Sequence, residues 1–259
     1  MKQEVSRFIE ERHEQILDLI DTKGRVTVKE LKDKFGMSLV TLRSDLKELE
    51  FQGKIRRTHG GAMAVEDKPF APPFSIRKSI NQSQKQAIGK AAAELVNNRE
   101  VIFIDGGTTA AEMRLFLSDK QNITVISPSI EVAYWLCVTT SVTIYMLNGF
   151  LLRESLGVIG EPAMETIDHW NISKAFCGAA GLTEDAGLTD NHVGFIEQKR
   201  IITKKAHKVV GLVDSSKWGV VSLGTFANIS EIDTIITDRS APRDMINCLK
   251  KHDIEVILA

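Results

Sequence analysis

Seven short apolar segments between residues 101 and 259 limit the folds open to this chain more than any other feature of its sequence. They are VIFID (101–105), ITVIS (123–127), VTIYML (142–147), KAFCGAA (174–180), KVVGLVD (208–214), IDTIITD (232–238) and IEVILA (254–259). Segments with helical periodicity separate them. Short apolar strands that alternate with helices are typical of a mainly parallel sheet covered by helices. The sequence therefore predicts an α/β domain over residues 81–259.

The first 63 residues predict a separate, smaller unit of three helices and a hairpin. An apolar stripe follows residues 8–20, and Gly24 after it suits a helix C-cap. Thr27 and Glu30 have the spacing of a capping box, which predicts a second helix over VKELKDKF that ends at Gly36. Ser38 then starts a third helix, SLVTLRSDLKELE, and KIRRTHGG after it predicts a basic strand and turn. This order of elements is typical of a winged helix-turn-helix domain.

The third helix is expected to have one buried and one exposed side. Its leucines recur at helical spacing, as a stripe facing a core does: Leu39, Leu42, Leu46 and Leu49. Small, polar and basic side chains lie on the other side, where they can enter a major groove and reach base edges. We predict DNA contacts from Ser38, Val40, Thr41, Arg43, Ser44 and Lys47. We predict phosphate contacts from Lys54, Arg56, Arg57 and His59.

The same pattern leaves another interpretation open, because a three-helix unit with mixed charges also fits a module that only packs or dimerises. Residues 1–60 carry 13 Lys and Arg against 11 Asp and Glu, so bulk charge does not decide between the two. Placement favours DNA, since residues 51–60 hold three basic residues and no acid. Asp45 cannot contact phosphate; it either pairs with Arg43 or Arg57 or is a solvated charge on the helix surface.

Residues 64–80 predict a linker, because they contain Pro69, Pro72 and Pro73 and show little periodicity. The expected division is a winged helix-turn-helix domain over 1–63, this linker, and the α/β domain over 81–259.

The clearest chemical motif is Asp105-Gly106-Gly107-Thr108-Thr109, between the apolar run VIFI and a segment of good helix formers, AAEMRLFL. Glycines let backbone N–H groups approach an anion, and a helix N-terminus and threonine hydroxyls add to the attraction. A phosphate or similar oxyanion is the expected guest, although a Gly-Gly turn after a strand is often only a turn. The motif is neither GxGxxG nor a Walker loop, so it predicts no dinucleotide, ATP or other cofactor.

Charged residues elsewhere can complete a site for a polyol phosphate, although each taken singly also fits a surface charge. Asp105 is expected to accept hydrogen bonds from sugar hydroxyls or from the amides of its own loop. Asp190 and Glu197 can grip hydroxyls, and Lys199 and Lys217 can neutralise the phosphate. The expected effector-binding residues are Asp105, Gly106, Gly107, Thr108, Thr109, Asp190, Glu197, Lys199 and Lys217.

Bulk properties argue against several other classes. The formal net charge is -1, so contact with nucleic acid needs a local basic patch. Cys137, Cys177 and Cys248 lie far apart without a CxxC pair, and the histidines show no metal-ligand spacing, which predicts reduced thiols and no metal site. No apolar run reaches the roughly 18 residues of a membrane span, and the N-terminus is charged rather than signal-like. We expect a cytoplasmic protein without membrane contact.

Two sets of segments resemble the DeoR family of bacterial repressors. ERHEQILDLI, GRVTVKELKDKFGMS and TLRSDLKELEFQGKIRRTHGGAM resemble its DNA-binding head. IFIDGGTT, KAFCGAAGL, GLTD, EQKR, KVVGLVDSSKWG and ISEIDTIITD resemble its sensor domain. The resemblance implies binding to double-stranded operator DNA and a sensor domain similar in fold to ribose-5-phosphate isomerase that takes a phosphorylated sugar as inducer. It also supports the effector-binding residues named above.

The chain departs from the family pattern at positions that bear on specificity. The family usually has two adjacent arginines where Arg43 and Ser44 stand, and a serine hydroxyl cannot make the bidentate guanine contact of an arginine. We therefore predict an altered operator preference. The family commonly has Asn at Pro128, Gly-Gly at 148–149 and a basic residue at Phe150, so the sugar end of the site is expected to differ.

The favoured function is a repressor of a carbohydrate-utilisation operon that binds DNA as a dimer or tetramer and is released by a phosphorylated sugar or polyol. The alternative is a sugar-phosphate isomerase with a regulatory head, because Asp, Glu and Lys can serve as base and enediolate stabiliser. Fold alone does not establish such an activity, and the basic hairpin has no purpose in a plain isomerase. An activator with the same architecture also remains open.

Overall fold

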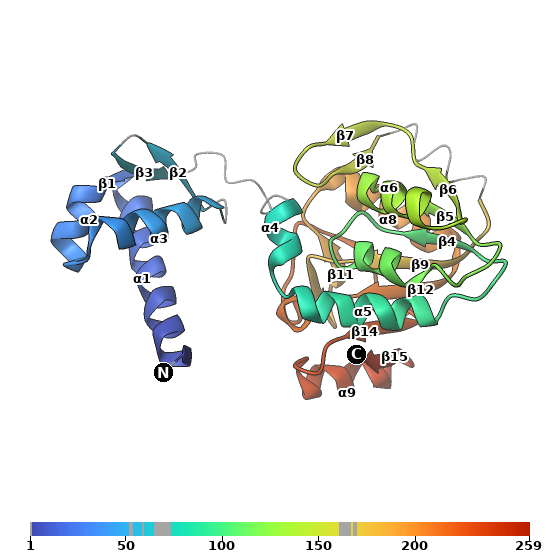
Figure 1. Ribbon diagram of the computed structural model, residues 1–259. Coiled ribbons are helices and arrows are strands. Elements are labelled where there is room, and N and C mark those ends of the chain that lie inside the picture. Colours follow the sequence, from blue (N-terminus) through green and yellow to red (C-terminus); the bar gives the residue numbers. More distant parts are fainter. Residues whose placement is uncertain (1, 52–53, 59, 65–73, 161–166, 168–169) are drawn as a thin grey trace. The chain divides into compact units, whose positions relative to one another are not determined.

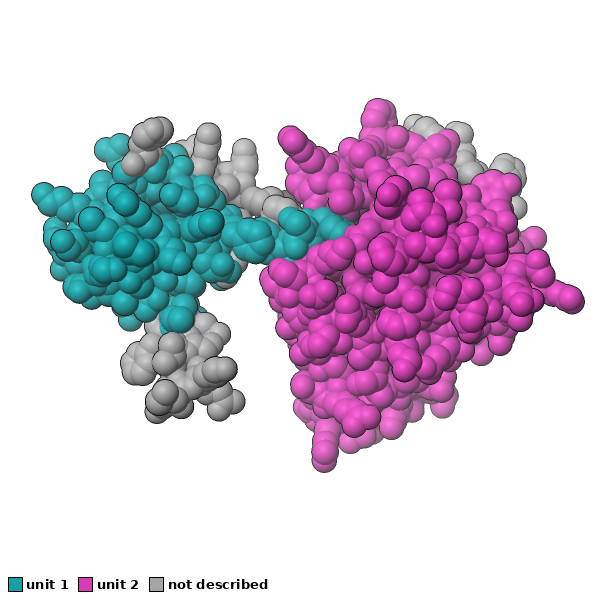
Figure 2. All heavy atoms as spheres, in the orientation of Figure 1, with its two compact units in different colours: residues 1–76 teal, residues 77–259 magenta. Residues whose placement is uncertain are grey.

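The computed structural model describes residues 2–51, 54–58, 60–64, 74–160, 167 and 170–259. The chain divides into two compact units, a first unit of Met1–Ile76 and a second unit of Arg77–Ala259 (Figures 1 and 2). Among the described helices, none has the combination of length and apolar character that crossing a bilayer requires.

The first unit is a winged helix-turn-helix, as the sequence predicts. Its helices are α1 (Lys2–Lys23), α2 (Val28–Phe35) and α3 (Leu39–Phe51). Its strands β1 (Arg25–Thr27), β2 (Ile55–Thr58) and β3 (Gly61–Ala64) form an antiparallel sheet in the order β1-β3-β2 (Figure 1). The β2–β3 hairpin is the wing.

Helix boundaries in the first unit follow the capping signals of the sequence. Gly24 follows α1 with φ 73°, and Gly36 caps α2 with φ 65°, conformations that favour glycine. The Thr27 hydroxyl accepts a hydrogen bond from the Glu30 amide at 3.2 Å, while the Glu30 carboxylate accepts one from the Thr27 amide at 2.7 Å. The Ser38 hydroxyl accepts from the Thr41 amide at 3.1 Å at the start of α3.

The core of the first unit corrects one detail of the predicted leucine stripe. Leu42, Leu46 and Leu49 are buried, whereas Leu39 is 40% exposed. Leu39 is the first residue of α3, one turn away from the part of the helix that packs against the core residues Ile16, Ile20, Val26, Leu31, Ile55 and Ala62. The stripe is therefore shorter than the spacing of the leucines predicts.

The predicted linker, residues 64–80, contains regular structure at both ends. Ala64 closes β3, and residues Phe74–Ser79 form helix α4. The three prolines of the segment lie outside the described residues. The boundary between the two units falls inside α4, so Arg77 and Lys78 belong to the second unit.

All seven predicted strands are present in the second unit and form one sheet. Its strand order is β15-β14-β12-β9-β4-β5-β6, and every neighbouring pair is parallel (Figure 1). The strands are β4 (Val101–Ile104), β5 (Thr124–Ser127), β6 (Thr143–Met146), β9 (Ile172–Gly178), β12 (Ala206–Leu212), β14 (Thr234–Thr237) and β15 (Glu255–Leu258). Buried side chains such as Phe103 and Phe176 fill the core around it.

Helices pack against strands of this sheet. They are α5 (Gln82–Glu94), α6 (Ile130–Thr139), α8 (Val193–Lys205) and α9 (Arg243–Lys251). Short 3-10 helices η1 (Ala110–Phe116), η2 (Ser215–Lys217) and η3 (Ile229–Glu231) join other elements. The sequence predicts an ordinary helix after the Gly-Gly turn. In η1, however, the Glu112 amide donates to the Thr109 carbonyl three residues back, the bonding of the tighter 3-10 winding.

In the described part of the second unit, five short strands lie outside the main sheet and are absent from the sequence prediction. β10 (Gly181–Thr183), β11 (Gly187–Asp190) and β13 (Gly224–Ala227) form a small antiparallel sheet, and β7 (Phe150–Leu152) pairs with β8 (Gly157–Ile159). They are three or four residues long, too short for periodicity to identify them.

The order of the large sheet reverses direction next to β4. The chain passes from β4 to β5 and β6 on one side, then returns to β9 on the other side of β4 and continues outward. In open parallel sheets, ligands bind at the carboxyl ends of the strands at such a reversal. Asp105, directly after β4, and Gly178, the last residue of β9, meet there.

Candidate functional site

The outer face of α3 is exposed as the sequence predicts. Ser38, Arg43, Ser44 and Lys47 are exposed, and Val40 is 77% exposed. Thr41 is half-buried beside Ser38. Ser44 and Lys47 are three residues apart, so they lie on the same side of the helix as Val40. This face carries the mixture of small, polar and basic groups that base-edge contacts need.

The wing supplies further basic groups. Lys54 and Arg57 are exposed. The Arg57 amide donates to the Glu50 carboxylate at 2.9 Å, and its guanidinium lies 3.7 Å from the same group, which ties the wing to the end of α3. Arg56 belongs to β2, but its side chain and the whole of His59 lie outside the described residues.

The two interpretations considered for Asp45 are both wrong. Asp45 is 6% exposed and accepts two hydrogen bonds from the Arg12 guanidinium, each 2.8 Å long. His13 Nε2 lies 3.2 Å from the same carboxylate. Asp45 follows Leu42 by three residues and precedes Leu49 by four, so helical spacing directs it inward, toward α1. It holds α3 against α1.

Three predicted residues of the second unit meet in a buried ionic cluster at the sheet reversal. Lys199 Nζ lies 2.8 Å from Asp105 Oδ2 and 2.6 Å from Asp190 Oδ2, and it donates to the Gly178 carbonyl at 2.8 Å. Burial works against the charge on Lys199, but the two carboxylates outweigh it and raise the pKa of this ammonium above its ordinary value. Its three N–H donors have three acceptors, so a phosphate contact by Lys199 requires one of them to be released.

Glycines allow this cluster to close. Asp105 Oδ2 also accepts a hydrogen bond from the Gly178 amide at 3.0 Å. A Cβ atom at Gly107 or at Gly178 would lie 3.2 Å from that same oxygen, so a larger residue would crowd it. Gly106 faces Pro128, whose ring would lie 3.6 Å from a Cβ placed there. Gly107 and Gly178 thus give Asp105 room that a side chain would narrow, whereas a Cβ at Gly106 would make an ordinary contact with Pro128.

The remaining predicted residues are distributed around this point. Thr108 and Thr109 are buried directly after the glycines. Lys217 is half-buried at the end of η2. Glu197 is exposed and lies about 200° around α8 from Lys199, so the structure does not bring it into the ionic cluster.

Two basic residues that the sequence analysis did not include extend this region: Arg77 of α4 interacts with the acids of the cluster, and Lys85 of α5 contacts Arg77. Burial lowers the pKa of the Arg77 guanidinium, while the charges of Asp190 and Asp105 oppose that shift. Lys85 is 5% exposed and donates to the backbone carbonyls of Arg77 and, at 2.7 Å, of Ile80. Burial lowers the pKa of Lys85 to about 8, and nearby Lys217 and Arg77 add to this shift against the pull of Asp214.

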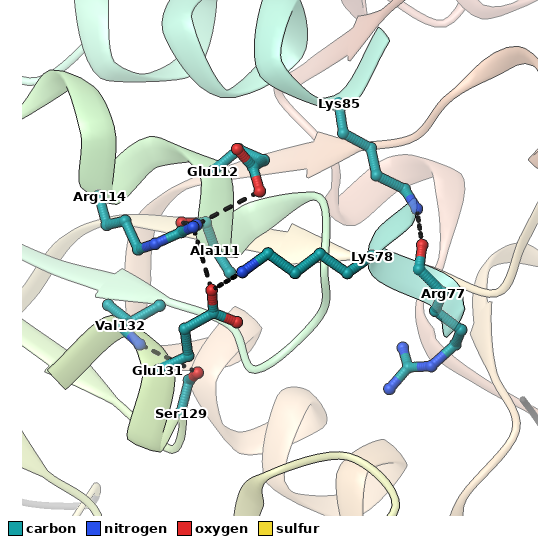
Figure 3. A network of polar contacts seen from close by, with 9 residues as sticks. All are labelled: Arg77, Lys78, Lys85, Ala111, Glu112, Arg114, Ser129, Glu131 and Val132. Atoms are coloured by element: carbon teal, nitrogen blue, oxygen red, sulfur yellow. Dashed lines mark hydrogen bonds and ion pairs between the residues drawn. The ribbon is translucent and has the colours of Figure 1, made fainter. Parts of the chain in front are cut away.

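A second buried network joins α4 to the helix after the Gly-Gly turn (Figure 3). Lys78 of α4 pairs with Glu131 of α6, and Arg114 of η1 lies 3.0 Å from the same carboxylate. Arg114 also lies 3.3 Å from Glu112, its neighbour in η1. Within the described part of the chain, Glu112 Oε2 and Arg114 Nε are buried without a hydrogen-bond partner. The network balances two acids with two bases, although not every polar atom is satisfied.

A winged helix-turn-helix followed by an α/β unit with polar groups at its sheet reversal defines a DNA-binding regulator with a ligand-responsive domain. Residues 12–68 match the DeoR-like helix-turn-helix domain, and residues 80–239 match the DeoR C-terminal sensor domain. The chain belongs to the DeoR family of transcriptional regulators.

Several relatives match along nearly their whole length. The HTH-type transcriptional regulator GolR of Listeria innocua is 32% identical over 96% of this chain and 98% of its own. The glycerol-3-phosphate regulon repressor of Escherichia coli is 30% identical over 96% and 98%. The HTH-type transcriptional regulator IolR of Bacillus subtilis is 30% identical over 97% and 98%.

Among solved structures, a ribose 5-phosphate isomerase A from Methanocaldococcus jannaschii aligns with 53% of this chain and 55% of its own, with a TM-score of 0.40 and 24% identity. This overlap is too low to support a functional inference.

Proposed function

We propose that this protein represses genes for carbohydrate use and leaves its operator when a phosphorylated sugar or polyol binds the second unit. Its family and relatives such as the glycerol-3-phosphate regulon repressor support this assignment. The observation that carries the effector proposal is the meeting of Asp105, Gly178 and Lys199 at the reversal of the parallel sheet. The protein would act in the cytoplasm, together with its operator.

The first unit binds double-stranded DNA in this proposal. The exposed face of α3, with Val40, Ser44 and Lys47, enters the major groove, and Lys54 and Arg57 of the wing contact phosphates. Because basic contacts release counterions from DNA, binding should weaken strongly as salt rises.

The effector phosphate binds the amides and hydroxyls of residues 106–109 in this proposal, with Lys217 and Arg77 as its cationic partners. The cluster of Asp105, Asp190 and Lys199 carries one net negative charge when both acids are ionised, so an anion needs these further cations nearby. Asp105 and Asp190 each have a second carboxylate oxygen that can accept from sugar hydroxyls. Lys199 orients both acids rather than contacting the phosphate.

Helix α4 transmits the effector signal in this proposal. It adjoins residues 65–73, through which the chain reaches the first unit, and it is fastened at two points. Lys85 of α5 donates to the carbonyls of Arg77 and Ile80 at the C-terminal end of α4. Lys78 of α4 pairs with Glu131 of α6 (Figure 3). Arg77 of the same helix interacts electrostatically with Asp190 and Asp105 of the effector site. An effector that engages Arg77 therefore acts on α4 directly.

We propose a regulator without isomerase activity. The matching family models and the curated relatives are those of transcriptional regulators, and the Lys199 ammonium holds Asp105 and Asp190 as parts of one ionic cluster. An aldose–ketose assay with pentose and hexose phosphates tests this: turnover by the purified protein would favour the isomerase alternative.

A homo-oligomer, dimer or tetramer, would present two heads to paired half-sites. Exposed large apolar side chains on the consecutive elements α6, β6 and β7 support such association: Tyr134, Val138, Tyr145, Met146, Phe150 and Leu151. Light scattering of the wild type and of Phe150→Asp tests this, since the charged variant should have a lower mass per particle.

A thermal-shift screen with sugar phosphates identifies the effector, because a ligand of the folded state raises stability. With the best ligand, Lys217→Met should weaken binding by about tenfold or more, the loss of one charge-assisted contact. Lys208→Met is the matched control, since Lys208 is exposed near the opposite, amino end of β12. Equal affinities of the two variants would contradict the proposed phosphate position.

Operator titrations with and without effector test the route through α4. Lys78→Met should reduce the factor by which effector weakens operator binding, a ratio that is measured independently of any change in the effector affinity of the DNA-free protein. Lys90→Met, an exposed change on α5, is the control. An unchanged coupling factor in Lys78→Met would contradict this route without affecting the proposed effector site.

A further inference from the structure

A group of three metal-ligand side chains lies away from the effector site. Glu184 stands in the turn between β10 and β11, Cys248 is on α9, and His252 caps the C-terminal end of that helix. One donor atom from each residue lies within 4.8 Å of the other two. Cys248 and His252 are four residues apart, so they point to the same side of the helix end.

The three donor types suit a borderline metal ion. Thiolate and imidazole favour zinc over magnesium or calcium, and a carboxylate is a common third ligand. With bonds of about 2.0 to 2.3 Å, tetrahedral ligands lie roughly 3.3 to 3.7 Å from one another. His252 Nε2 and Glu184 Oε1 are 3.0 Å apart, and the largest separation in the group is below 4.8 Å. The separations in the group are therefore close to those of a tetrahedral site.

The charges around the group favour a cation. The Cys248 thiol shares a hydrogen bond with Glu184, and this carboxylate raises the pKa of the thiol. The same contact, with His252, lowers the pKa of Glu184. Asp185 adds a negative charge nearby, and Lys251 adds a positive one. A divalent ion would replace the thiol proton and neutralise both the thiolate and the carboxylate.

We propose that Glu184, Cys248 and His252 bind one zinc ion, with water at the fourth position. This site lies within the second unit and is independent of the proposed effector site. Bound metal would fasten the β10–β11 turn to the C-terminal helix α9.

Cobalt(II) is the probe for this site, since a cobalt–thiolate bond produces a charge-transfer band in the near ultraviolet. The full chain is reduced, stripped of metal with a chelator and titrated with Co²⁺. We expect one thiolate-bound cobalt per chain, displaced by an equal amount of Zn²⁺. Cys248→Ser should abolish the band. Cys137→Ser, which changes an exposed thiol on α6, should retain it.

The other two ligands are tested in the same titration. Glu184→Gln and His252→Gln should each weaken cobalt binding at least tenfold, while His207→Gln, an exposed control, leaves it unchanged. Circular dichroism of each metal-free variant checks that it is folded. Absence of a band in the wild type would overturn the proposal, as would a band that survives Cys248→Ser. If Glu184→Gln and His252→Gln bind like the wild type, Cys248 binds metal alone and the three-ligand site is wrong.

Discussion

Replacing Lys199 by methionine removes the cation from the buried ionic cluster at the sheet reversal. The side chains of Lys199, Asp105 and Asp190 are only 4%, 2% and 13% exposed, so water cannot replace the lost charge. Methionine fills a similar volume but leaves two facing carboxylates and the Gly178 carbonyl without their donor. Removing one partner of a buried ion pair costs about 3–5 kcal/mol. That is at least about a fifth of the roughly 5–15 kcal/mol that stabilises a typical domain.

Urea unfolding followed by tryptophan fluorescence measures this loss in the second unit alone. All three tryptophans of the chain, Trp135, Trp170 and Trp218, lie in it. The unfolding midpoint of Lys199→Met should fall while the slope stays unchanged. Lys204→Met, an exposed change on the same helix, should stay within about 0.5 kcal/mol of the wild type.

The loss should also depend on pH. Without Lys199 the two carboxylates share a buried site, so at least one has a folded pKa above its unfolded value of about 3.9. Such a group destabilises the fold as pH rises past the unfolded value, and the deficit should be larger at pH 7.5 than at pH 4.5. In the wild type, the raised pKa of Lys199 provides stability that persists until strongly alkaline pH. A loss below about 1 kcal/mol at pH 7.5 would refute the structural role argued for this cluster.

Three further predictions concern other parts of the chain. Ser44→Arg should change the bases preferred in a selection from random duplexes; identical preferences would contradict a major-groove position for Ser44. Asp45→Asn should destabilise the first unit by about 2 kcal/mol through loss of the charged contact with Arg12, seen as faster amide exchange in α3, and unchanged exchange would contradict this. Between pH 8 and 10 folded Lys85 loses its proton, whereas the unfolded residue keeps it up to about 10.5, so the wild type should gain stability relative to Lys85→Met by at most about 1.4 kcal/mol per pH unit; a constant difference would exclude this ionisation.

The parts of the fold that the sequence predicts are those with strong local signals. Seven apolar segments became the seven strands of one parallel sheet, because strands covered by helices need apolar side chains on both faces. Thr27, Gly36 and Ser38 stand at helix ends where their backbone or side-chain chemistry places them. The exposed face of α3 follows from helical periodicity alone.

The ion pairs between residues far apart in the sequence could not be predicted from the sequence alone. Asp45 looked like a surface acid because its partner Arg12 is 33 residues away on another helix. Periodicity indicated that Asp45 shares the side of Leu42 and Leu49, and that signal was available. The sequence predicts a phosphate contact for Lys199. In the structure, its ammonium is already paired with Asp105 and Asp190 at the sheet reversal.

Because the prolines of residues 64–80 predict a linker, the sequence analysis assigned no role to the basic residues of α4. Such a composition predicts a lack of regular structure, yet Lys78 lies on a helix and pairs with Glu131, 53 residues later in the sequence. The sequence analysis treated histidines and cysteines separately and so did not use the four-residue spacing of Cys248 and His252. That spacing suggests our proposed metal site once the fold brings Glu184 beside the two residues.

The charges around Asp105 set a condition that any anionic effector must meet. The cluster formed with Asp190 and Lys199 repels an anion unless cations from elsewhere compensate, and on our proposal Arg77 of α4 supplies one of them. Effector affinity then depends on α4 being held in place, and the position of α4 depends on the effector. Since coupling between two binding events is reciprocal, operator DNA that favours another arrangement of α4 must weaken effector binding by the same factor by which effector weakens operator binding. Equal effector affinity with and without operator would therefore exclude α4, and any other element, as the carrier of the signal.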